Sequence, residues 1–284
     1  MEELKTLGYT LQAWKSFSDI SKIEYSAYWN NAALEVEKEV FWVSDGDFDR
    51  MERYLNDSGL IGQFHQALEF LDRNLGRCLE GTGADLAAGN LWAVPLILQS
   101  GPVKKIYAIE YSKHRLVDLG PKVLQNYRVP RDNVILCLGS FYELEIAHKS
   151  LDFIFLAQAF HHADDTDRLL GEIRRVLKPK GVVLIIGEHV FDKQPSVRGL
   201  LKAAAKRAVS RSVAWIIQGL FRRRHYEEPT FFSKLRQANL DPILGDHYYS
   251  LREYHDIFSR NGFRYWNLRG VKPEIQSFVL VQEH

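Results

Sequence analysis

The chain has 284 residues, of which 46% are hydrophobic, and its formal net charge is +1. A chain of this length can bury a full core, and a charge so close to zero gives no overall argument for binding nucleic acid or a membrane surface. Its two cysteines are too few for a disulfide framework, so we expect a reducing compartment.

Neither a signal peptide nor a membrane span is expected. The first residues, MEELKTLGYTLQAW, lack the apolar stretch of a signal peptide. The apolar run from Val213 to Phe221 is far shorter than the roughly 20 residues that a membrane span needs. We therefore expect a soluble, cytoplasmic protein.

Residues 1–78 are predicted to form a helical N-terminal extension. Phe48, Met51 and Leu55 recur at helical spacing before the turn signal Asp57-Ser58-Gly59. A second helical pattern runs from Ile61 to Leu75 and ends at Gly76.

Residues 79–190 alternate between strand and helix patterns and are predicted to form the core domain. The strands are expected near residues 83–86, 105–110, 133–138, 151–157 and 182–187, with helices after the first, second and fourth. Pro121 should interrupt the second helix. The run Val182–Gly187 is apolar without alternation, which is typical of a strand covered by helices on both faces and therefore of a largely parallel sheet.

Residues 191–250 are predicted to form a basic helical insertion. No acidic residue occurs from Lys193 to Arg224, where nine lysines and arginines share the sequence with apolar residues at helical spacing. We consider four roles, in decreasing order of preference: a lid over a substrate pocket, a solvated face, a surface for anionic lipid or a lipid-linked substrate, and a nucleic-acid surface. Residues 251–284 then predict a helix and two closing strands.

The turn Ala87–Asn90 and the acid Glu110 suggest a nucleotide site. Glu110 follows Gly89 by 21 positions, close to the roughly 20-residue offset at which a dinucleotide-binding unit places its ribose-binding acid. The turn is poor in glycine, because Ala87 and Leu91 stand where a G-x-G-x-G turn has glycine. An ordinary strand-to-helix turn therefore remains an alternative at this point.

Four segments carry a family resemblance: ADLAAGNLW, IYAIEYSKHRL, LGSFYELEI and SLDFIFLAQAFHHADDTDRLLGEIRRVLKPKGVVLIIGEH. Together they resemble the successive motifs of class I S-adenosylmethionine-dependent methyltransferases, in particular the small-molecule type often called methyltransferase type 11. The resemblance covers residues 79–190 and more loosely the final helix and strands. It implies a doubly wound, Rossmann-like α/β sheet of five parallel strands plus a closing pair, one of them antiparallel.

The resemblance also implies the cofactor S-adenosylmethionine and a set of residues that bind it. Asp85 matches the acid that reaches the methionine amino group, Glu110 matches the acid that takes both ribose hydroxyls, and Ser140 stands where many relatives carry an adenine-binding Asp. The whole implied cofactor-binding set is Asp85, Ala87, Gly89, Glu110, Tyr111, Ser140, Phe141, Ala157 and Gln158. The predicted reaction is methyl transfer to a small-molecule acceptor, with oxygen favoured over nitrogen or carbon.

A hydroxyl acceptor would gain from a base, and the candidates are His161, His162, Glu188, His189 and His247. Of these, His161, His162 and His247 are the predicted catalytic histidines. Ordinary hydrogen-bonded packing is the competing reading for each of them. No metal site is expected, because adjacent residues such as His161 and His162 rarely converge on one ion and no distant third cluster supports them.

Two other functions stay open. A non-catalytic scaffold that binds S-adenosylmethionine would fit the glycine-poor turn. A nicotinamide-dependent oxidoreductase uses a similar strand–turn–helix unit, but the chain has no Tyr-x-x-x-Lys spacing and the missing glycines would crowd a pyrophosphate. The sequence does not predict the oligomeric state.

Overall fold

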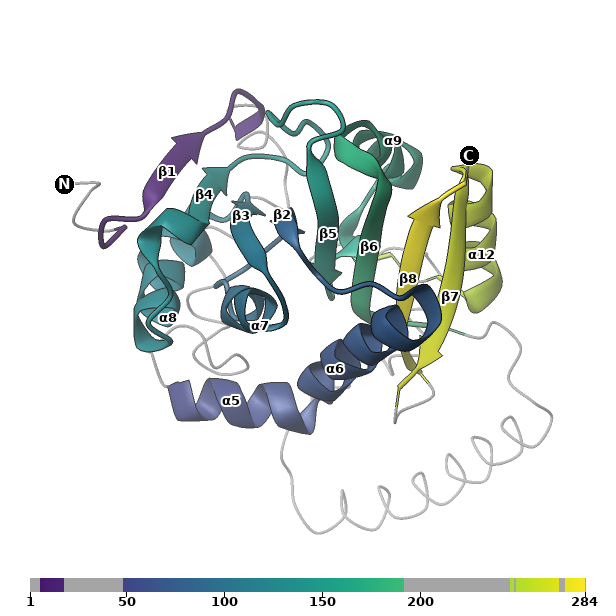
Figure 1. Ribbon diagram of the computed structural model, residues 1–284, viewed down its shortest axis with the longest axis horizontal. Coiled ribbons are helices and arrows are strands. Elements are labelled where there is room, and N and C mark those ends of the chain that lie inside the picture. Colours follow the sequence, from purple (N-terminus) through teal and green to yellow (C-terminus); the bar gives the residue numbers. More distant parts are fainter. Residues whose placement is uncertain (1–5, 18–47, 192–245, 248, 271–273, 284) are drawn as a thin grey trace, which may run out of the picture.

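The computed structural model describes residues 6–17, 48–191, 246–247, 249–270 and 274–283. An eight-stranded sheet runs through these residues in the order β1-β4-β3-β2-β5-β6-β8-β7 (Figure 1). The strands are β1 (Thr10–Ala13), β2 (Gly81–Leu86), β3 (Val103–Glu110), β4 (Val134–Leu138), β5 (Leu151–Ala157), β6 (Leu177–His189), β7 (Phe263–Arg269) and β8 (Ile275–Gln282).

The sheet is parallel from β1 to β6, and only β8 runs against its neighbours. The predicted sheet of five parallel strands with a closing pair, one antiparallel, is therefore confirmed for β2 to β8. Strand β1 adds a sixth parallel strand at the edge beside β4.

Strand β1 corrects the prediction of a wholly helical N-terminal extension. Thr10 to Ala13 pair in register with Ile135 to Leu138 of β4, and the Trp14 N–H donates to the Leu138 carbonyl at 2.9 Å. A four-residue edge strand with mostly exposed side chains carries too short a pattern to be recognised. Its hydrogen bonds come from β4, which lies far away in the sequence. Residues 18–47 lie outside the described part of the chain.

The predicted basic helical insertion lies largely outside the described residues, and the other predicted helices are present. They are α5 (Phe48–Asp57), α6 (Leu60–Phe70) with its continuation η2 (Leu71–Leu75), α7 (Ala93–Gln99), η3 (His114–Leu119), α8 (Gly120–Asn126), η4 (Arg131–Asn133), η5 (Phe160–His162), α9 (Thr166–Val176) and α12 (Leu251–Arg260). As expected, Pro121 marks an interruption, because η3 changes to α8 one residue before it.

Two buried clusters lie on opposite faces of the sheet, so the sheet is doubly wound (Figure 1). Along β5, Phe153 and Phe155 belong to the cluster that helices α5 to α8 cover, whereas Ile154 and Leu156 belong to the cluster that α9 and α12 cover. This alternation follows from the two-residue period of a strand. A strand buried on both faces must be apolar at successive positions, as its sequence is.

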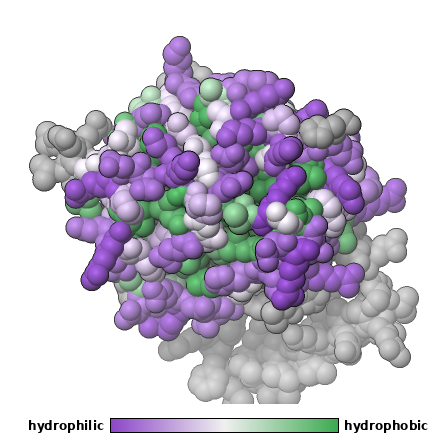
Figure 2. All heavy atoms as spheres, viewed as in Figure 1, coloured by the Kyte–Doolittle hydropathy of each residue, from purple (hydrophilic) through white to green (hydrophobic). Residues whose placement is uncertain are grey.

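The predicted domain limits at residues 190 and 250 remain predictions. Of residues 191–250, the structure describes Phe191, Asp246, His247, Tyr249 and Ser250, and the basic run 193–224 lies outside the described ranges. Among the described helices, none combines the length and hydropathy of a membrane span. On the face that Figure 2 shows, hydrophilic residues cover most of the described surface and hydrophobic ones gather near its centre.

Candidate functional site

The turn after β2 holds its backbone in conformations that suit glycine. Ala87, Gly89 and Leu91 have φ angles of 55°, 56° and 69°, which lie in the left-handed region. That region costs an L-residue with a side chain roughly 1–2 kcal/mol. Ala87 and Leu91 stand where a G-x-G-x-G turn has glycine. They therefore adopt the backbone conformation of that turn with some strain.

Glu110 lies at the end of β3, and its carboxylate is hydrogen-bonded to this turn. Its Oε2 accepts a hydrogen bond from the Gly89 N–H at 2.8 Å, and its Oε1 accepts from the N–H groups of Tyr111 and Ser112, each at 2.8 Å. Its side chain is buried. Three amide donors stabilise the carboxylate, so β2 and β3 are joined at their carboxyl ends by one acidic group.

Asp85 is the second buried acid at this edge of the sheet. It is 2% exposed, and its Oδ2 has no hydrogen-bond partner among the described residues. Burial, and after it the negative charge of Glu110, hold the pKa of Asp85 well above its ordinary value. A buried oxygen without a donor is uncommon in proteins, and a positively charged ligand group would supply one.

The loop after β4 contributes Ser140 and Phe141, and the N-terminal segment closes over it. The Ser140 N–H donates to Ser16 Oγ at 3.0 Å, and Ser140 Oγ accepts from the Tyr142 N–H at 3.1 Å. A hydroxyl has further capacity as a donor, so Ser140 can still contact a ligand. A side chain at Gly139 would collide with Trp14.

Tyr111 follows Glu110 and is half-buried. Burial, and then the charge of Glu110, raise the pKa of its hydroxyl far above the ordinary value, so Tyr111 is neutral at physiological pH. Asp246 also acts on this hydroxyl through its charge, so the two ends of the site lie within electrostatic range of each other.

The end of β5 places Ala157 and Gln158 beside the N-terminal helices. Gln158 has a φ of 50°, and its N–H donates to the Ile186 carbonyl at 2.8 Å. Its side chain hydrogen-bonds with Tyr54 of α5. Helix α5 therefore reaches the edge of the sheet at which the predicted cofactor residues gather.

Glu188, near the end of β6, organises the residues that follow β5. It is fully buried and accepts five hydrogen bonds, from the N–H groups of Ala159, Phe160 and His161, from His161 Nδ1 at 2.8 Å, and from the Tyr254 hydroxyl at 3.1 Å. Burial alone would raise the pKa of this carboxyl, but the contact with His161 outweighs burial and lowers it. Conversely, burial lowers the pKa of His161, and Glu188 raises it above the ordinary value.

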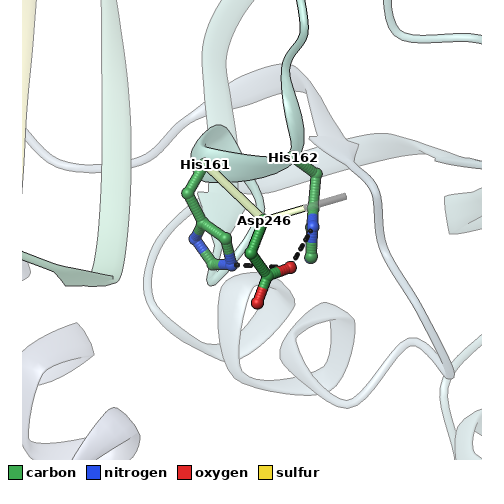
Figure 3. A group of neighbouring side chains, drawn as sticks. All are labelled: His161, His162 and Asp246. Atoms are coloured by element: carbon green, nitrogen blue, oxygen red, sulfur yellow. Dashed lines mark ion pairs between the residues drawn. The ribbon is translucent and has the colours of Figure 1, made fainter. Parts of the chain in front are cut away.

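Asp246 joins His161 and His162 from a distant part of the chain. Its Oδ1 lies 2.9 Å from His162 Nδ1 and 3.8 Å from His161 Nε2 (Figure 3). Burial and then the neighbouring His161 lower the pKa of His162, so this imidazole is neutral at physiological pH. The structure thus brings together two of the three predicted catalytic histidines and adds a carboxylate.

His247 does not join this cluster. Its Nε2 lies 2.9 Å from Asp164 Oδ1, and its backbone N–H donates to the His161 carbonyl at 2.7 Å. The main chain of His247 therefore binds to His161, whereas its side chain pairs with Asp164 outside the cluster.

Three contributors were not found from the sequence: Ser16, Tyr254 and Asp246. Each meets the site through a contact between residues far apart in the chain. The signal for Asp246 and Tyr254 is indirect, because both lie in residues 245–254, which are dense in polar and aromatic residues.

Residues 84–185 match a family model described as a methyltransferase domain. A demethylmenaquinone methyltransferase of Halalkalibacterium halodurans is 30% identical over 109 residues, which are 38% of this chain and 43% of that protein. A malonyl-[acyl-carrier protein] O-methyltransferase of Methylococcus capsulatus is 30% identical over 97 residues, which are 34% of each chain. In both cases this chain matches less than half of the relative's length.

The fold has solved counterparts. The structure of a DhpI–SAH complex superimposes with a TM-score of 0.55 at 15% identity, covering 91% of this chain and 95% of that chain. At this identity the likeness concerns the fold alone.

Proposed function

We propose that the protein transfers the methyl group of S-adenosylmethionine to a small-molecule acceptor, and the match of residues 84–185 to a methyltransferase-domain model supports this proposal. The observation that carries the proposal is the pairing of Glu110 with the Gly89 turn, at 2.8 Å, at the carboxyl ends of β2 and β3. Open α/β sheets bind their ligands at this edge.

The residues at this edge fit the donor. Glu110 offers a carboxylate to the ribose hydroxyls, and Asp85 offers its unpartnered buried oxygen to the positively charged methionine amino group. Tyr111, Ser140 and Phe141 belong on the adenine side, and Ala157 and Gln158 beside the methionine portion. The strained turn at Ala87 and Leu91 weakens the site but leaves the amide of Gly89 in place.

When bound, the donor supplies a methyl group on a positively charged sulfur, ready for displacement by a nucleophile. The protein's part is to hold the acceptor in line, which can supply much of the acceleration. The expected acceptor atom is oxygen, because the histidines and carboxylates after β5 and β6 form a polar environment suited to a hydroxyl group. The names of the two curated relatives point to different acceptors, so they do not fix the one used here.

One alternative has a specific observation in its favour. Ala87 and Leu91 strain the turn, which would fit a scaffold that binds the donor without using it. Incubating the protein with methyl-labelled S-adenosylmethionine and a small-molecule cell extract separates the two functions. The proposal predicts a labelled small molecule, formed by the wild type and lost in Glu110→Ala. A protein that binds the donor but labels nothing would be a scaffold.

A further inference from the structure

His161, His162 and Asp246 bring three potential metal-binding atoms to one point beside the predicted acceptor site. The imidazole nitrogens and the carboxylate oxygen all lie within 4.8 Å of one another, and both rings turn toward the carboxylate (Figure 3). The two histidines come from η5, after β5, and Asp246 comes from the segment before α12. Two adjacent histidines alone do not predict a metal site, but Asp246 supplies a third ligand from a distant part of the chain.

Local structure explains how two adjacent histidines can serve one site. They lie in a 3-10 turn closed by the His162 N–H, which donates to the Ala159 carbonyl at 3.1 Å. Their ring centres are 4.3 Å apart. Residues next to each other on a strand would point to opposite faces, whereas this turn keeps both rings on one side.

Backbone contacts fix the position of Asp246. The next residue, His247, donates its N–H to the His161 carbonyl at 2.7 Å, and the Phe191 N–H donates to the Tyr249 carbonyl at 2.9 Å. These two main-chain hydrogen bonds, at His247 and Tyr249, therefore hold the segment that carries Asp246 beside the histidines.

A second carboxylate orients the more buried histidine. His161 Nδ1 lies 2.8 Å from Glu188 Oε2, which leaves Nε2 toward Asp246. Histidines that bind metals usually donate their other nitrogen to a carboxylate in this way, which fixes the ring and its tautomer. Glu188 is itself held by three backbone amides, so the arrangement is rigid.

The two distances from Asp246 to the imidazoles suit an ion. A tetrahedral ion with bonds of about 2.0–2.1 Å separates its ligand atoms by roughly 3.3 Å, and the two contacts of Asp246 measure 2.9 and 3.8 Å. The side chains of Asp246 and His162 are 22% and 23% exposed, but the facing atoms, His162 Nδ1 and Asp246 Oδ1, are buried, so a bound ion would be shielded from solvent. Two carboxylates meet here, and a divalent cation would balance their charge.

We propose that His161, His162 and Asp246 bind a divalent transition-metal ion, with Glu188 positioning His161. Two imidazoles and one carboxylate suit zinc and its first-row neighbours. Three protein ligands leave a coordination position open, and we assign this position to the polar atom of the methyl acceptor. That assignment rests on the proposed function, whereas metal binding itself does not.

The test uses tag-free full-length protein, dialysed against Co²⁺ and then freed of loosely bound metal. We expect one ion per wild-type chain, with the visible absorption of cobalt bound by nitrogen and oxygen. Asp246→Asn and His162→Ala should lose both signals, and Glu188→Gln should weaken binding about 10- to 100-fold. His148→Ala, which removes an exposed histidine, should bind as the wild type does.

Two outcomes would overturn the proposal. If the wild type retains no more cobalt than Asp246→Asn, the cluster is an ion pair that binds no metal. If all variants bind cobalt equally, the metal is adventitious. Circular dichroism checks that each variant is folded. Glu110→Ala separates the two proposals, since it should lose S-adenosylhomocysteine binding and keep its cobalt.

Discussion

The Gly89 N–H donates a hydrogen bond to Glu110 Oε2 at 2.8 Å, joining the turn after β2 to the end of β3. With the amides of Tyr111 and Ser112 on Oε1, three of the roughly four acceptor positions of the carboxylate are used. Binding two ribose hydroxyls should therefore release one amide. Gly89 belongs to the turn, so its amide resonance should shift most when S-adenosylhomocysteine is added, and an unmoved resonance would contradict this account.

Glu110→Gln should weaken S-adenosylhomocysteine binding about 10- to 100-fold. The amide keeps one acceptor oxygen and turns an NH₂ group toward backbone donors, and a hydrogen bond to a charged group contributes roughly 1.5–3 kcal/mol. Calorimetric titration measures the change. Glu69→Gln, at an exposed ion pair with Arg73, is the matched control and should bind normally.

Asp85→Asn should raise the stability of the free protein while lowering its affinity for the donor. The pKa of Asp85 is raised in the folded state, so its contribution to stability is full below the unfolded pKa and is lost as pH rises through the folded pKa. Asparagine avoids that loss. Urea unfolding at several pH values should show that the free energy of unfolding of the variant rises relative to the wild type as pH increases. A difference that does not change with pH would contradict a raised pKa for Asp85.

The same group should make donor binding depend on pH. A positively charged amino group favours ionised Asp85, so binding releases a proton and strengthens as pH rises toward the raised pKa of the free carboxyl. The wild type should show this slope in titrations with S-adenosylhomocysteine. Asp85→Asn should flatten it, and an unchanged slope would assign the proton to another group.

Ala87→Gly and Leu91→Gly should have opposite effects, although both residues have positive φ. Glycine at position 87 relieves about 1–2 kcal/mol of strain and adds about 0.5–1 kcal/mol of backbone entropy cost, a net stabilisation of about 0–1.5 kcal/mol. Leu91 is fully buried, so its removal should cost more than about 2 kcal/mol. Thermal unfolding measures the stability of both variants. An equal loss of stability in the two would mean that the turn is not strained at Ala87.

Gly83→Ala should destabilise the protein by about 1–3 kcal/mol, because the new methyl group would overlap the buried ring of Phe153 on β5. Gly171→Ala is the control. Position 171 lies exposed on α9 with open space around it, so alanine there should stabilise the helix by about 0.5–1 kcal/mol. Denaturant unfolding of both variants tests the packing of β2 against β5.

The core could be predicted from the sequence because its signals are local. Strands β5 and β6 contain the continuous apolar runs Phe153–Ala157 and Val182–Ile186, and Asp165 caps α9 by accepting from the Arg168 N–H at 2.9 Å. The acid Glu110 was predicted from its offset to the turn. Each of these signals is contained in a short stretch of chain.

The parts that were missed depend on contacts between distant residues. Strand β1 exists because β4 offers it hydrogen bonds, and Asp246 reaches His162 across more than eighty positions. Neither contact leaves a periodic pattern in its own segment. The sequence shows that Ala87 and Leu91 replace glycine, but it does not show that both residues adopt the left-handed conformation.

The most direct test of the central claim is a pair of calorimetric titrations of the wild-type protein, one with S-adenosylmethionine and one with NADH. The unpartnered oxygen of Asp85 suits an amino group, and the turn lacks the glycines that a pyrophosphate needs, so the account predicts saturable binding of S-adenosylmethionine and none of NADH. Tight binding of NADH without any response to S-adenosylmethionine would contradict the account.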